Sequence, residues 1–222
     1  HVQSIIPRSG SVSGSTVVSI SGSDFKNTTG LFCRFGTLNA VKAVYISNTL
    51  IQCLSPSNEE GIVNIEVTTN GVDYSEDMVQ FRYFASPAIS HTIPSSGPSE
   101  GGTIVSVYGR NFIDSDTLYC RFGNSTSVLG RWISGDRIEC VAPPMDAGNV
   151  VISMSNNGLD YTITNSSFMV LPESKVSIVS PTFGPVGTLT AVTVRGTGFV
   201  FSRSLYCRFG LSAVAAMYIN ET

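Results

Sequence analysis

Short segments of the chain alternate apolar and polar residues. In residues 16–20 the apolar side chains of Val18 and Ile20 share one face, and residues 63–67 repeat the alternation over a second segment. A period of two places successive side chains on opposite faces of an extended strand, so these segments predict half-buried β-strands. No segment carries a sustained apolar period of about 3.6 residues, as a helix packed on a core would. We therefore expect an all-β protein with almost no helix.

The strand pattern recurs at a spacing of 87 residues. The tetrapeptide Cys-Arg-Phe-Gly begins at Cys33, Cys120 and Cys207, and several prolines, glycines and aromatic residues keep the same spacing. This period is longer than the roughly 20–50 residues of a solenoid repeat and suits a small domain with its own core. The repeat predicts three modules, namely residues 1–84, residues 88–171 and an incomplete third over residues 176–222.

The segments between the modules are short. Residues 83–88 and 170–175 are largely apolar, and each contains a proline. A flexible tether would instead be rich in glycine and serine. We expect tight connections and a rod-like array of modules.

An Asn-Gly dipeptide follows the longest apolar strand of each complete module, at Asn70-Gly71 and at Asn157-Gly158. This dipeptide accepts the two positive φ angles of a type I′ turn. We therefore expect a tight two-residue hairpin at each position, with positive φ at both residues.

The ordered motifs of each module resemble the IPT/TIG domain (immunoglobulin-like, plexin, transcription factor). In the first module these motifs lie at Pro7, Gly22, Phe25, Cys33 to Gly36, Ile51, Cys53, Pro56, Asn70, Gly71, Asp73, Tyr74 and Phe81. The second module carries them 87 residues later, and the third matches as far as Gly210. The resemblance covers almost the whole chain and implies tandem immunoglobulin-like β-sandwiches. Such modules occur in surface receptors, in secreted or adhesive proteins and in a few transcription factors, and the fold alone does not choose among them.

The cysteines repeat with the modules. Cys33 and Cys53 are 20 residues apart, as are Cys120 and Cys140. Four cysteines allow three pairings, and the repeat favours one bridge inside each module. The alternative is pairs of buried free thiols in a cytosolic protein. We expect the two disulfides and hence an oxidising, extracellular setting.

Four Asn-x-Ser/Thr sequences fit the pattern for N-linked glycosylation. They begin at Asn27, Asn124, Asn165 and Asn220. The first three lie in turns between predicted strands, whereas Asn220 lies near the end of an apolar stretch. We expect N-linked glycans as covalent partners of a secreted or cell-surface chain.

Charge and hydropathy exclude other partners. Only 13% of the residues are charged, and the formal net charge is −3. A nucleic-acid-binding surface would need a basic patch, so no nucleic acid is expected. No apolar run approaches the roughly 18 residues of a membrane-spanning helix, so we expect no direct membrane insertion of this segment.

Candidate chemistry is sparse. The acidic residues that could bind calcium are Asp73, Asp114, Asp116 and Asp160, and they fit turns better than a site of six to eight oxygens. His1 and His91 are the only histidines, and the sequence contains neither a nucleophile elbow nor a phosphate loop. Trp132 occupies the slot of Tyr45, and both are expected to pack. We expect no enzyme, no metal and no cofactor.

Two functions from different classes fit the sequence. The first is a non-catalytic structural or adhesive array that builds an extracellular rod or fibre by end-to-end association with other modules or copies of itself. The second is a ligand-binding ectodomain segment of a plexin-like receptor, which predicts that one module diverges by an exposed aromatic or basic patch. The sequence shows no such divergence, which favours the array.

The third module is predicted to lack the strands that would complete its sandwich. Val192, Val194, Phe199 and Phe209 would then have no opposing sheet. We expect the native chain to continue, with a partner for Cys207 four or five residues beyond Thr222. The alternative is completion by a strand of another subunit.

Overall fold

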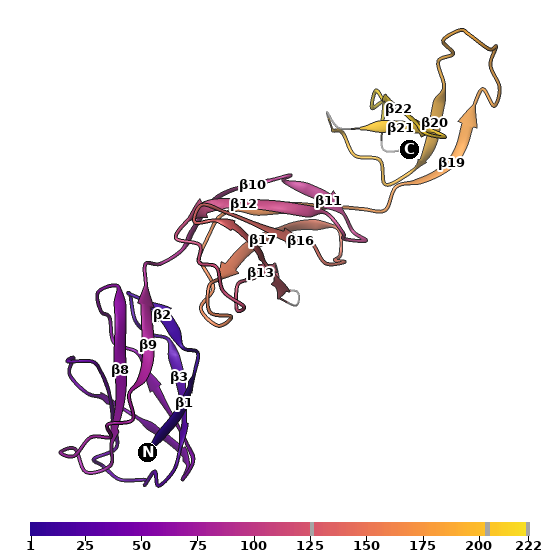
Figure 1. Ribbon diagram of the computed structural model, residues 1–222. Coiled ribbons are helices and arrows are strands. Elements are labelled where there is room, and N and C mark those ends of the chain that lie inside the picture. The colour runs from indigo at the N-terminus through magenta and orange to yellow at the C-terminus, as the bar shows by residue number, and fades with distance from the viewer. Residues whose placement is uncertain (125–126, 203–204, 221–222) are drawn as a thin grey trace.

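The computed structural model describes residues 1–124, 127–202 and 205–220, and every regular element in them is a β-strand (Figure 1). The strands form three successive groups along an extended molecule, with the termini in the first and last groups (Figure 1). The described residues contain no helix that could span a membrane. The all-β prediction is confirmed.

The first module is a sandwich of two sheets. One sheet has the order β1-β3-β7-β6 and the other β2-β9-β8-β4-β5. All neighbouring strands are antiparallel except β2 and β9, which run parallel. The strands are β1 (Val2–Ile6), β2 (Ser9–Ser11), β3 (Val17–Gly22), β4 (Phe32–Phe35), β5 (Val41–Lys42), β6 (Val44–Ser47), β7 (Leu50–Leu54), β8 (Gly61–Thr68) and β9 (Val79–Phe84).

The second module repeats this sandwich. Its sheets have the orders β10-β12-β16-β15 and β11-β18-β17-β13-β14, and the strand pairs keep the register of the first module at the 87-residue offset. The strands are β10 (Ala88–Ile93), β11 (Ser96–Pro98), β12 (Ile104–Arg110), β13 (Tyr119–Phe122), β14 (Val128–Leu129), β15 (Arg131–Ser134), β16 (Arg137–Val141), β17 (Gly148–Ser155) and β18 (Ser167–Leu171). The two modules are therefore tandem immunoglobulin-like sandwiches, as predicted.

Aromatic rings fill the space between the sheets. In the first module Phe81 makes edge contacts with Phe35 and Tyr83, at ring-centroid distances of 5.4 and 5.0 Å. The Tyr83 hydroxyl donates a hydrogen bond to the Pro56 carbonyl, and burial raises the pKa of Tyr83 to about 12. The second module has the corresponding pair of Phe122 and Phe168, 5.6 Å apart. Edge-to-face packing places the positive edge of one ring on the negative face of the next, which stabilises the core beyond area burial.

The repeated Gly-x-x-Phe motif has a steric cause. A Cβ atom on Gly22 would lie 2.0 Å from the His1 carbonyl oxygen and 2.8 Å from the ring of Phe25. A Cβ atom on Gly109 would meet the Ala88 carbonyl oxygen, also at 2.0 Å, and the Phe112 ring. Only glycine lets the first strand and the phenylalanine approach this closely.

Each complete module carries one disulfide between its two sheets. Cys33 on β4 is bonded to Cys53 on β7, and Cys120 on β13 is bonded to Cys140 on β16. All four cysteines are buried among core residues. Each disulfide therefore links the inner faces of the two sheets, across the space that the aromatic rings fill.

Over residues 175–202 and 205–220, the third group has four strands in two separate pairs. These are β19 (Lys175–Ser180) with β20 (Thr193–Thr197), and β21 (Tyr206–Phe209) with β22 (Ser212–Ala215). Val194 is half-buried and Phe209 is 49% exposed, whereas their counterparts in the complete modules are fully buried. Cys207 has a free, half-buried thiol. In the described residues the third group thus buries its apolar positions less than the first two modules do.

Removing the first disulfide should destabilise its module. Closing a loop of about 20 residues contributes about 3 kcal/mol on the chain-entropy model. We expect the Cys33→Ala, Cys53→Ala double variant to lower the free energy of unfolding of the first module by about that amount. Amide hydrogen exchange resolved by module measures it, with Cys207→Ala as the control that should leave both complete modules unchanged. Equal protection in the double variant would contradict the prediction.

Candidate functional site

The Asn-Gly dipeptides do not form two-residue hairpins, and this prediction is wrong. Gly71 and Gly158 have φ values of +80° and +78°, but neither Asn70 nor Asn157 has a positive φ. The chain between β8 and β9 spans residues 69–78, and the chain between β17 and β18 spans residues 156–166. Each dipeptide begins a long loop.

The asparagine side chain determines the shape of this loop. The Asn70 Oδ1 accepts hydrogen bonds from the backbone N–H groups of Val72 and Asp73, both at 2.9 Å, and the Asn70 Nδ2 donates to Asp73 Oδ2 at 2.8 Å. Asn157 makes the same contacts with Leu159 and Asp160. This is an Asx turn, in which a side chain replaces a backbone carbonyl. It competes with the type I′ turn, because the asparagine remains in the ordinary φ region.

In each loop, the tyrosine that follows the aspartate contacts the arginine of the Cys-Arg-Phe-Gly tetrapeptide. The Arg34 guanidinium lies 3.9 Å from the centre of the Tyr74 ring, and Arg121 lies at the same distance from Tyr161. Arg34 also pairs with Glu66 on the neighbouring strand. The two most conspicuous motifs of the repeat therefore form one contact on the outer face of the sheet, where a cation over an aromatic face is favourable.

The predicted glycosylation positions are all exposed. Asn27 lies between β3 and β4, Asn124 follows the end of β13, and Asn165 lies just before β18. The hydroxyl residue of the second sequon, Thr126, and that of the fourth, Thr222, lie outside the described residues. Occupancy of the four sequons stays a prediction.

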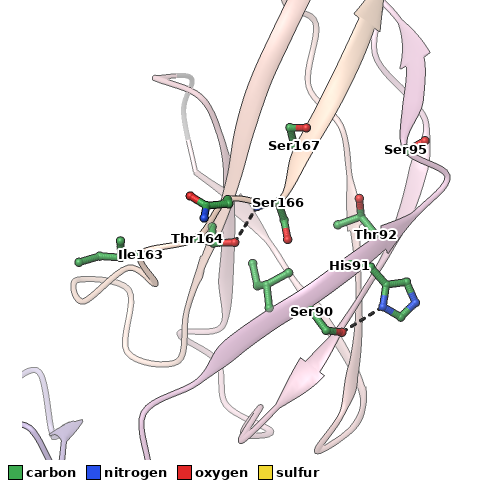
Figure 2. Close-up of a pocket in the computed structure, with 10 residues that line it drawn as sticks. Ser90, His91, Thr92, Ser95, Ile163, Thr164, Ser166 and Ser167 are labelled. Carbon is green, nitrogen blue, oxygen red and sulfur yellow. Dashed lines mark hydrogen bonds between the residues drawn. The ribbon is translucent and has the colours of Figure 1, made fainter.

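A shallow groove of about 600 Å³ lies on the second module, beside strand β10 (Figure 2). Its walls are β10 and the segment 163–167, and Asn165 lines it. Figure 2 shows Thr164 and Ser166 on one side of β10 and the His91 ring turned to the other side. In the first module the counterpart of Thr164 is Asp77, which accepts a hydrogen bond from the Val2 backbone N–H at 2.6 Å. A glycan on Asn165 would cover the groove.

A cross-strand ladder of aromatic and charged side chains lies on the β10-β12-β16-β15 sheet. His91 stacks on Tyr108 with ring centroids 4.7 Å apart, and the Arg137 guanidinium lies 5.7 Å from the Tyr108 ring. Glu139 accepts hydrogen bonds from Arg137 and Arg131. The hydrogen bond from Arg131 is the main cause that lowers the pKa of the Glu139 carboxyl. Within the described chain, the buried Nε of Arg137 has no hydrogen-bond partner.

The ladder corrects the prediction that no module diverges. Its counterparts in the first module are Ser4, Ser21, Leu50, Gln52 and Val44. A row of aromatic and charged residues in the second module thus replaces a row of uncharged, non-aromatic residues in the first. The motifs and loops of the repeat do not reveal this difference, because its residues occupy outward-facing strand positions. Comparing outward-facing strand positions at the 87-residue offset would have found it.

The other candidate chemistry does not assemble into a site. Among the described residues, no group of three or more His, Cys, Asp or Glu side chains could hold a metal ion. Asp73 and Asp160 are turn residues, as expected. Trp132 is 38% exposed, and its indole N–H donates to the Phe112 carbonyl at 3.1 Å.

Comparison with known proteins agrees with the repeat. The IPT/TIG domain model matches residues 1–83 and 87–169. The chain is 26% identical to human fibrocystin-L over 204 residues, which cover 90% of this chain and 5% of fibrocystin-L. It is 26% identical to human plexin-A3 over 214 residues, which cover 89% of this chain and 11% of plexin-A3.

Two further matches support less, one because it covers under half of this chain and the other because its sequence identity is low. The probable serine/threonine-protein kinase drkC of Dictyostelium discoideum is 29% identical over 102 residues, which cover 42% of this chain and 14% of the kinase. The solved extracellular region of plexin A4 superposes with a TM-score of 0.54 and 16% identity, over 100% of this chain and 20% of that one. The structural likeness shows the fold alone. The chain spans only a small part of each of these proteins.

Substitution of Gly71 isolates the backbone requirement of the Asx-turn loop. No atom lies within 4 Å of a Cβ built on Gly71, so a side chain there meets open space and the strained φ of +80° is the whole cost. We expect Gly71→Val to lower the stability of the first module by about 1 kcal/mol or more, because a β-branched residue resists this region. The control is Val72→Ala, since Val72 is 76% exposed. An unchanged melting midpoint for Gly71→Val would refute the assignment.

Proposed function

The chain belongs to the IPT/TIG domain family, and from this premise we propose that it is a structural or adhesive segment of a secreted or cell-surface protein. In this proposal the modules build an extracellular rod and associate end to end with other modules or with copies of the chain. IPT/TIG modules are non-catalytic, and the solved structure of plexin A4 that this chain resembles is that of its extracellular region. The disulfides suit the same compartment.

One observation carries the proposal: two complete modules repeat the same sheet order and register, and their junction is bonded from both sides. Ser86 of the connecting segment contacts the Ser11 hydroxyl of the first module, and its carbonyl accepts a hydrogen bond from Asn111 of the second. A connection held in this way transmits force and keeps a fixed spacing, which suits a rod better than a flexible tether does.

The ladder on the second module favours a second function, that of a ligand-binding ectodomain segment. Exposed arginine and aromatic side chains are enriched at binding hot spots. Arg131, Tyr108 and His91 lie together on one sheet face, and the first module has no equivalent. In this second proposal the ligand is a protein with a polar or acidic surface that contacts this face.

Association between copies tests the first function. We expect beads coated with the chain to cluster and the free chain to show concentration-dependent, elongated species by sedimentation velocity. Because the ladder has no part in end-to-end association, Arg137→Ala should cluster equally well. If the chain neither clusters beads nor associates at high concentration, the adhesive proposal fails. If the unchanged chain clusters the beads and Arg137→Ala does not, the ladder face is the adhesive surface, and the end-to-end proposal is wrong.

Glycan occupancy tests the compartment. In protein purified from its native source, we expect N-linked glycans at Asn27, Asn124 and Asn165, and also at Asn220, because all four side chains are exposed. Intact-glycopeptide mass spectrometry reads each sequon separately. Four bare asparagines would argue for an intracellular chain.

A further inference from the structure

The Asn-Gly loop of the second module contacts the end of the first module. The Thr16 hydroxyl donates a hydrogen bond to Asp160 Oδ2 at 2.6 Å, and the Asn157 Nδ2 donates to the Ser9 carbonyl oxygen at 2.9 Å. Thr16 is fully buried, and Asn157 is 4% exposed. The loop and the edge of β2 therefore exclude solvent from each other.

The same loop exists in the first module without a module on it. Asn70 donates to Asp73 Oδ2 at 2.8 Å, and Asn157 donates to Asp160 Oδ2 at the same distance. Yet Asn70 and Asp73 are exposed, while Asn157 is buried. The loop thus keeps the same side-chain hydrogen bonds whether it is covered or bare, and such preorganisation lowers the ordering cost of docking.

The complementary edge also repeats. A Cβ atom on Gly10 would lie 2.4 Å from the Thr16 hydroxyl oxygen, and a Cβ atom on Gly97 would lie 2.3 Å from that of Thr103. Each threonine is therefore held in the same place, over a Ser-Gly pair on the parallel edge strand. Thr103 is only half-buried, in contrast to Thr16. Each complete module presents a loop at one end and an edge at the other.

We propose that the Asn-Gly-x-Asp loop is the docking surface between successive modules, and that its occupant is the Ser-Gly and Thr edge of another IPT/TIG module. In this chain the loop of the second module is occupied by the first module. The loop of the first module, Asn70 to Asp73, is the same surface presented free. The sequence motif shared by both modules thus has an inter-module role in addition to shaping its own turn.

The contact is suited to modules joined in one chain. Two hydrogen bonds are few for two separate molecules, whose loss of translational freedom they must offset. A short linker raises the effective concentration of the edge near the loop, and there a small contact is sufficient. Ser86 and Asn111 fix that linker against both modules. The preferred occupant of the free loop is therefore a module linked directly ahead of it.

The chain supplies its own matched control, because Asp160 and Asp73 have the same place in two equivalent loops. Asp160→Ala and Asp73→Ala both remove the internal bond to asparagine, but only Asp160→Ala removes the acceptor for Thr16. We expect the amides of residues 9–16 to exchange at least about tenfold faster in Asp160→Ala, since a hydrogen bond to a charged group is lost. Small-angle scattering should show a broader range of maximum dimensions. Asp73→Ala should change neither measurement.

Thr16→Val tests the other side of the contact, with Thr103→Val as its control, because valine keeps the shape and removes the donor. Faster exchange of residues 157–160 is expected for Thr16→Val alone. If Asp160→Ala behaves like its control Asp73→Ala, or Thr16→Val like its control Thr103→Val, the contact is incidental. Unchanged hydrogen exchange across the junction and an unchanged scattering profile in either variant would then show that the proposal is wrong.

Occupation of the free loop is tested by adding a second copy of residues 1–87 directly before His1, which keeps the repeat in register. We expect the amides of residues 70–73 to become protected, as those of 157–160 are in the original chain. Asp73→Ala should now loosen the added junction. Equal exchange of residues 70–73 with and without the added module would overturn the assignment of the occupant. These outcomes are independent of whether separate copies of the chain adhere.

Discussion

The packing of two sheets onto one aromatic core is the constraint on which the rest of each module depends. Stacked sheets lie about 10 Å apart, and large side chains must fill that space. Phe81 contacts both Phe35 and Tyr83, and the disulfide between Cys33 and Cys53 crosses the same space. The Cys-Arg-Phe-Gly motif places one residue of the disulfide and one of the aromatic rings on a single strand. Its arginine faces outward between them, because side chains alternate along a strand.

That alternation connects the core to the surface motifs. The outward arginine lies under the tyrosine of the Asn-Gly-x-Asp-Tyr loop, so a strand that builds the core also positions the loop. The loop in turn presents its asparagine and aspartate at the end of the module where a neighbour docks. Core packing, loop shape and module junction are therefore parts of one arrangement. The residues of all three parts accordingly recur in the second module at the 87-residue spacing.

Most of the fold could be predicted from the sequence, and the failures have specific causes. Period-two alternation identified the strands that bury Val18 and Ile20, and the repeat identified which cysteines share a module. The Asn-Gly turn was misassigned because side-chain hydrogen bonds of Asn70 override the preference of the dipeptide. The divergence at His91 and Tyr108 is visible in a comparison of outward-facing strand positions, but their stacking follows only once β10 and β12 are paired in register. Contacts between modules, such as Thr16 with Asp160, span 144 residues, and no local pattern marks them.

The shared strand register also has a consequence for folding. Neighbouring domains with interchangeable strands are prone to misassembly, in which equivalent segments exchange between domains. Here β4 and β13 have the same place in their sheets and the same Cys-Arg-Phe sequence, so their exchange is the misassembly to expect. The disulfides make such an exchange detectable, because a swapped product would join Cys33 to Cys140 rather than to Cys53. If each module folds as it is synthesised, its disulfide can form before the cysteines of the next module appear. Cys33 is then already bonded to Cys53 when Cys140 is made. Folding in the order of synthesis would therefore protect an array of such similar modules from strand exchange.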